Sequence, residues 1–69
     1  MKIRMVAARV NAGLTQEKMA RKMKVNKRTI INWENDKTIP SENDFKDYCR
    51  ICGMEEKYVK RPERKPPQS

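Results

Sequence analysis

The sequence predicts an all-α fold, a compact bundle of four to five short helices. Two observations lead to this prediction. Apolar residues recur at the i, i+3, i+4 and i+7 spacing of a helix face, and capping residues, glycines and a proline separate the periodic segments. No segment shows the alternation of apolar and polar residues that is typical of a strand, and no internal repeat is visible. We therefore expect helices to form the core.

The first expected helix ends near Asn11, and Gly13 follows it as a residue that can adopt the left-handed conformation of a helix stop. The apolar residues expected on its buried face are Ile3, Val6, Ala7 and Val10. Thr15 can accept a backbone hydrogen bond as N-cap of the second helix, with Glu17 in the first turn. The residues expected on the buried face of this second helix are Met19, Ala20 and Met23.

The third expected helix follows a tight turn. Asn26 is a candidate N-cap only three residues after Met23, which leaves room for no more than a short turn between two helices. The third helix covers about Lys27–Glu34, and Ile30 and Trp33 lie three residues apart on its inner face.

A fourth helix is expected after an extended connection that includes Pro40, because the residue before a proline is pushed out of the helical region. Ser41 is the expected N-cap of this helix, and Gly53 ends it. Its apolar stripe is Phe45, Tyr48, Cys49 and Cys52. A last turn or short fifth helix is expected around Met54, Tyr58 and Val59. We divide the chain into a domain over residues 1–59 and a basic, proline-rich flexible tail over residues 60–69.

Seventeen Lys and Arg residues against nine Asp and Glu residues give the chain a formal net charge of +8. Residues 1–35 hold nine basic and two acidic side chains, whereas residues 36–59 hold four basic and six acidic ones. A chain with this imbalance is suited to a polyanion, so phosphate is the expected partner chemistry. The basic surface is expected on the first three helices.

Other classes of function find little support in the sequence. The chain has no histidine and no glycine-rich phosphate loop, so we expect no enzyme activity, no small-molecule substrate and no cofactor. Cys49 and Cys52 supply two of the four ligands that zinc needs, which favours packing over a metal site; a site shared across a dimer is the alternative. No export signal and no apolar stretch of ~20 residues is visible, which predicts a cytoplasmic protein without membrane contact.

A helix, a short turn and a second helix over residues 15–35 form the pattern of a helix-turn-helix, whose second helix can lie in the major groove of DNA. With Ile30 and Trp33 facing inward, the residues on the outer face are Lys27, Arg28, Ile31 and Asn32. Arg and Lys can bond guanine, Asn can bond adenine, and an apolar side chain can touch the thymine methyl group. We expect these four outer residues to read bases.

Three groups of residues carry a family resemblance. They are the segment AGLTQEKMA at residues 12–20, the residues Val25, Asn26, Thr29, Ile30, Trp33, Glu34 and Asn35 around the third helix, and Pro40, Phe45 and Gly53 beyond it. With this spacing the chain resembles the lambda-repressor-like helix-turn-helix domains of phage repressors, Cro proteins and similar bacterial regulators of the XRE type. The resemblance covers about residues 2–59.

The resemblance implies roles for further residues. The residues that it places against DNA phosphate are Thr15, Gln16, Asn35 and Lys37, and an outer base is the alternative contact of Gln16. Arg9 would pair with Glu34 and tie the first helix to the end of the third, and the fourth helix with the segment after it would form a two-fold homodimer. Asp36 stands where the family usually has Gly, and its negative charge would lie near the phosphate contact.

These patterns together predict a sequence-specific transcription regulator that binds double-stranded DNA. We expect a repressor or Cro-like switch that acts as a homodimer on a near-palindromic operator. The alternative is an antitoxin-like module that uses the same fold for protein contacts. Salt-dependent, sequence-selective DNA binding would support the regulator, and a stoichiometric protein complex without DNA affinity would support the alternative.

Overall fold

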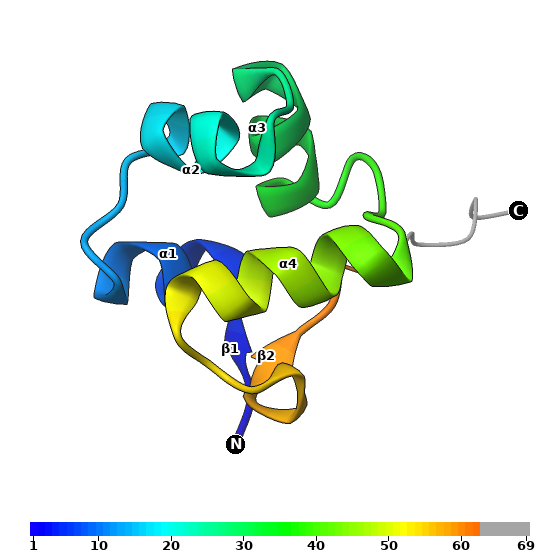
Figure 1. Cartoon of the computed structure of the whole chain (residues 1–69). Helices are drawn as coiled ribbons and strands as arrows, with labels where there is room; N and C mark the ends of the chain where they lie inside the picture. The colour runs from blue at the N-terminus through cyan, green and yellow to red at the C-terminus, as the bar shows by residue number, and fades with distance from the viewer. Residues whose placement is uncertain (63–69) are drawn as a thin grey trace, which may run out of the picture.

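The structure, a computed structural model, describes residues 1–62 of the chain. Its elements in order are β1 (Ile3–Arg4), α1 (Met5–Asn11), α2 (Gln16–Met23), α3 (Lys27–Glu34), α4 (Glu42–Cys52), the 3₁₀ turn η1 (Glu56–Tyr58) and β2 (Val59–Lys60). Figure 1 shows α2 and α3 above α4 and the two short strands below it. The small, mainly helical bundle predicted from the sequence is confirmed.

Local signals begin α2 and α4, and end α4, as the sequence predicts. The hydroxyl of Thr15 accepts a hydrogen bond from the backbone N–H of the third residue after it at 3.1 Å, which caps α2. Ser41 caps α4 in the same way, at 3.2 Å. Gly53 ends α4 in the left-handed conformation with φ +73°, where a side chain would be strained. These caps depend on neighbouring residues alone, which is why the sequence reveals them.

The buried face of α1 differs from the predicted one. The structure buries Met5, Ala8 and Arg9, whereas Val10 is 60% exposed. The helix begins only at Met5, because the two residues before it are extended and pair as a strand. The expected stripe that began at Ile3 therefore had the wrong helical phase.

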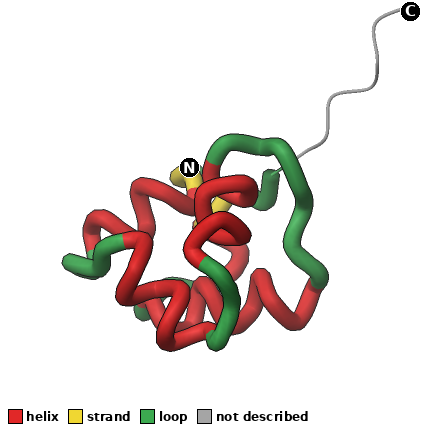
Figure 2. The backbone as a smooth tube through the Cα atoms, turned by 90° about the horizontal axis from the view of Figure 1, so that it is seen from above, coloured by secondary structure: helices red, strands yellow, loops and turns green. Residues whose placement is uncertain are grey.

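The two short strands were not predicted. β1 and β2 form a parallel pair in which Ile3 lies opposite Val59 and Arg4 lies opposite Lys60. Figure 2 shows them in yellow, side by side near the N-terminus. Strands of two residues are too short to show an alternating pattern, so the sequence carries no periodic signal for them. The last helical turn expected near residue 58 is the 3₁₀ turn η1, which leads directly into β2.

The first residues of the expected tail pack on the domain. Lys60 belongs to β2, Arg61 donates a hydrogen bond to the carbonyl oxygen of Pro40 at 2.8 Å, and Pro62 is buried. Residues 60–62 therefore belong to the folded unit rather than to a separate tail. The rest of the predicted tail, residues 63–69, lies outside the described residues.

One apolar core joins all four helices and β2. Its residues are Met5, Ala8, Met19, Ala20, Ile30, Trp33, Phe45, Tyr48, Cys49 and Val59. Burial raises the pKa of both Cys49 and Cys52 to about 11, so each is a neutral thiol near pH 7. Within residues 1–62 no cluster of three or more metal-ligating side chains occurs, and no helix is long and apolar enough to cross a membrane.

Candidate nucleic-acid interface

The turn between α2 and α3 is built by a left-handed residue that the sequence did not reveal. Lys24 has φ +60° and ends α2, and the N–H of Val25 then donates to the carbonyl oxygen of Ala20 at 3.0 Å. The side chain of Asn26 makes no capping hydrogen bond, contrary to expectation, although its backbone carbonyl accepts one from Thr29 at 3.0 Å. The resulting turn lets α2 and α3 pack closely against each other.

The orientation of α3 separates an inner from an outer face. Ile30 and Trp33 are buried in the core, as predicted. Lys27 and Arg28 in the first turn are exposed. Ile31 and Asn32, the other two predicted base-reading residues, are partly buried. The exposed start of α3 is therefore cationic and lies opposite its apolar face.

The segment after α3 presents polar groups next to the end of the helix. Asn35 and Lys37 are exposed, and the backbone N–H of Lys37 donates to the carbonyl oxygen of Asn32 at 2.9 Å. Asp36 adopts the left-handed conformation with φ +60°, which Asp tolerates and which Gly would adopt at lower cost. Arg4 lies 3.4 Å from the Asp36 carboxylate and thus partly neutralises it.

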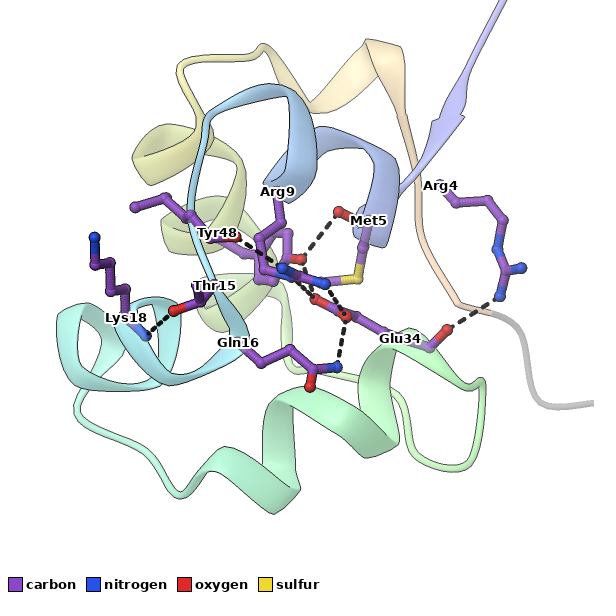
Figure 3. A network of polar contacts seen from close by, with 9 residues as sticks. Arg4, Met5, Arg9, Thr15, Gln16, Lys18, Glu34 and Tyr48 are labelled. Atoms are coloured by element: carbon purple, nitrogen blue, oxygen red, sulfur yellow. Dashed lines mark hydrogen bonds and ion pairs between the residues drawn. The ribbon is translucent and has the colours of Figure 1, made fainter.

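A buried ion pair fixes α1 against the end of α3. The Arg9 guanidinium donates from Nε to Oε2 of Glu34 at 2.7 Å and from Nη2 to Oε1 at 3.1 Å (Figure 3). This bidentate pair joins Arg9 and Glu34, the two residues whose pairing the family resemblance implies. Nη1 of Arg9 also donates to the carbonyl oxygen of Leu14 at 2.7 Å, which holds the segment before α2.

Two further side chains complete a network around Glu34. Gln16, the first residue of α2, donates from Nε2 to Glu34 Oε1 at 3.1 Å. The Tyr48 hydroxyl of α4 lies 2.6 Å from Glu34 Oε2 and 2.9 Å from the carbonyl oxygen of Met5, so its one hydrogen serves two acceptors. One carboxylate therefore connects all four α-helices. In the sequence Tyr48 counts only as a member of the apolar stripe of α4, and the signal for its further role is the hydroxyl, which needs a hydrogen-bond partner when it is buried.

Comparison with known proteins agrees with this geometry. The family model described as a helix-turn-helix domain matches residues 3–63. The chain belongs to the helix-turn-helix domain family. The helix-turn-helix is a DNA-binding unit, and the family is one of DNA-binding regulators. No curated protein and no solved structure matches the chain.

The charge of Glu34 is stabilised inside the helix-turn-helix domain. Burial by itself would raise the pKa of this carboxyl group. The hydrogen bonds from Arg9, Tyr48 and Gln16, together with the charge of Arg9, outweigh burial and hold the pKa of Glu34 below its ordinary value. Burial, followed by the hydrogen bond to the Glu34 carboxylate, raises the pKa of Tyr48, so its hydroxyl keeps its proton.

This lowered pKa predicts a loss of stability in acid. In the unfolded chain Glu34 has its ordinary pKa of about 4.5, so on acidification the unfolded state binds this proton before the folded state does. The contribution of the Glu34 carboxylate is complete above about pH 4.5 and is lost as the pH falls through the lower folded value. An NMR titration of the carboxyl carbon in the folded protein is expected to give a midpoint below 4.5, and a midpoint above it would contradict the prediction.

Proposed function

We propose that this helix-turn-helix protein is a sequence-specific transcription regulator that binds double-stranded DNA as a homodimer. It acts as a repressor or Cro-like switch, and it represses by occupying promoter DNA. The observation that carries the proposal is the exposed, cationic first turn of α3. The last residue of this helix, Glu34, is held by hydrogen bonds from the other three helices.

The position of this charge is costly without an anionic partner. Lys27 and Arg28 lie at the N-terminal end of α3, where the helix dipole disfavours cations by about 0.3–1 kcal/mol each. A DNA backbone beside this end of the helix would reverse the sign of that interaction. Because the residues are exposed, they can reach base edges in a major groove that is wide enough to admit the helix.

The proposed phosphate contacts lie at both ends of the helix-turn-helix. The Thr15 hydroxyl accepts the capping bond from an N–H, so its own hydrogen can be donated to a phosphate oxygen. Gln16 uses one hydrogen of its amide nitrogen for Glu34 and keeps the second for a phosphate. Asn35 and Lys37, exposed beyond α3, are proposed to bind the backbone on the other side of the groove.

The proposed dimer requires a near-palindromic operator. Two recognition helices can enter the major groove on one face of the duplex when the half-sites lie about one helical turn, ~34 Å, apart. We propose that α4 and the segment after it supply the contact between protomers. Selection of bound sequences from a random DNA pool tests the proposal, because an operator with two inverted half-sites would be enriched.

Replacement of Arg28 and Lys37 separates base reading from phosphate binding. Arg28→Ala is expected to cost ~1–3 kcal/mol on the selected operator and to relax discrimination at one position in each half-site. Lys37→Ala is expected to weaken binding to operator and scrambled DNA alike, and to make the salt slope shallower by about one per site. Titrations of both variants against both duplexes at several salt concentrations measure the difference.

Two outcomes would contradict these assignments. If Arg28→Ala lost the same affinity for operator and for scrambled DNA, Arg28 would be a phosphate contact and the proposed base-reading face would be overturned. A wild-type chain that binds no DNA but forms a stoichiometric complex with another protein would overturn the regulator in favour of an antitoxin-like module.

A further inference from the structure

A small cavity lies between the strand pair and the C-terminal end of α3. Its volume is about 130 Å³. Met5 and Trp33 contribute apolar atoms to its lining, and the charged side chains of Arg4, Asp36, Lys60 and Arg61 line it as well. None of the residues proposed above to contact DNA lines this cavity.

The charge around the cavity is positive. Three cations, Arg4, Lys60 and Arg61, face one partly exposed carboxylate, that of Asp36. The pair of Arg4 with Asp36 is loose, since the atoms are 3.4 Å apart and the two side chains are 60% and 51% exposed. Glu34 also lines the cavity, but the buried Arg9 guanidinium balances its charge.

The fold, not the local sequence, brings these cations together. The parallel register places Arg4 of β1 opposite Lys60 of β2. Arg4 donates to the backbone carbonyl of Glu34 at 3.0 Å, and Arg61 donates to the carbonyl of Pro40 at 2.8 Å. The two guanidinium groups thus hold the start and the end of the segment that connects α3 to α4.

We propose that Arg4, Lys60 and Arg61 bind a phosphate of the DNA backbone at this cavity. The inference rests on the proposed function. The cavity is continuous with the segment after α3, because Asp36 lines it and stands between Asn35 and Lys37. A DNA strand that contacts Asn35 and Lys37 can therefore place a further phosphate at the cavity.

The donors at the site suit a phosphate diester. A guanidinium carries five N–H donors in a planar fork, and the bonds of Arg4 and Arg61 to backbone carbonyls leave several of them for phosphate oxygens. Lys60 adds an exposed ammonium group as a point charge. The Asp36 carboxylate repels a phosphate, but the three cations Arg4, Lys60 and Arg61 outnumber it at the cavity.

The test compares two single-charge variants of the full chain. Lys60→Gln removes a cation at the cavity, and Lys2→Gln removes an exposed cation before β1 that does not line it. Affinity for the selected operator and for a scrambled duplex is measured over a series of salt concentrations. For Lys60→Gln we expect a salt slope shallower by about 0.9 per protomer and the same fold-loss of affinity on both duplexes, with wild-type behaviour for Lys2→Gln.

The possible failures of the two proposals can be told apart. If wild-type protein binds neither duplex, the proposed function fails. If it binds DNA but Lys60→Gln keeps the wild-type slope, or Lys2→Gln makes the slope equally shallow, the cavity site is overturned while the proposed function stands. An NMR titration with inorganic phosphate adds a third arm: shifts at Arg4 and Arg61 with an unchanged slope for Lys60→Gln would make the cavity a site for free anions instead.

Discussion

Arg9→Ala is expected to lower the free energy of unfolding by about 3–5 kcal/mol. The substitution would leave the Glu34 carboxylate buried without its cation, and the hydrogen bonds from Tyr48 and Gln16 provide no compensating charge. It would also remove the hydrogen bond to the carbonyl of Leu14 that holds the segment before α2. Urea unfolding followed by circular dichroism measures the loss.

The exposed pair of Arg50 and Asp47 provides the control. Its atoms are 3.1 Å apart on α4, but the two side chains are 75% and 51% exposed. Arg50→Ala is therefore expected to cost less than about 1 kcal/mol, because water and salt screen such pairs. If Arg9→Ala and Arg50→Ala destabilised the protein equally, the network around Glu34 would not hold the helices together.

Arg9 also shows why a helical pattern alone misplaces α1. A charged residue is expected to face away from the apolar stripe of a helix. Arg9 nevertheless points into the domain, because the Glu34 carboxylate of α3 accepts its hydrogen bonds there. The family resemblance identified this pair, whereas periodicity favoured a stripe through Val10, which is exposed. Glu34, whose pairing with Arg9 decides which face of α1 is buried, lies on α3, so the sequence around α1 carries no signal for it.

Interactions between distant segments explain the other missed features. β1 exists because Val59 returns to lie beside Ile3, and a two-residue strand has no pattern of its own. The cavity beside α3 needs both strands in place, so its cations are scattered in the sequence. By contrast, the caps of α2 and α4 depend on residues a few positions apart, and Thr15 and Ser41 could be identified directly.

Trp33→Ala is expected to lower the free energy of unfolding by ~3–5 kcal/mol. Trp33 is 4% exposed and belongs to the same core as residues of α1, α2 and α4, so its loss would open a large apolar void. A domain of this size has a total stability near the low end of 5–15 kcal/mol, and the variant is expected to be largely unfolded at 37 °C. Because Trp33 is the only tryptophan, circular dichroism rather than fluorescence must follow unfolding.

Tyr58→Ala is the matched control, because it removes an aromatic ring that is 48% exposed in η1. Its cost is expected to be well below that of Trp33→Ala, since less of the ring leaves water on folding. Trp33→Phe refills part of the void, so its loss in free energy of unfolding is expected to lie between those of Trp33→Ala and Tyr58→Ala. A Trp33→Ala variant as stable as Tyr58→Ala would mean that Trp33 does not face the core, and the outer face of α3, with Lys27 and Arg28, would have to be reassigned.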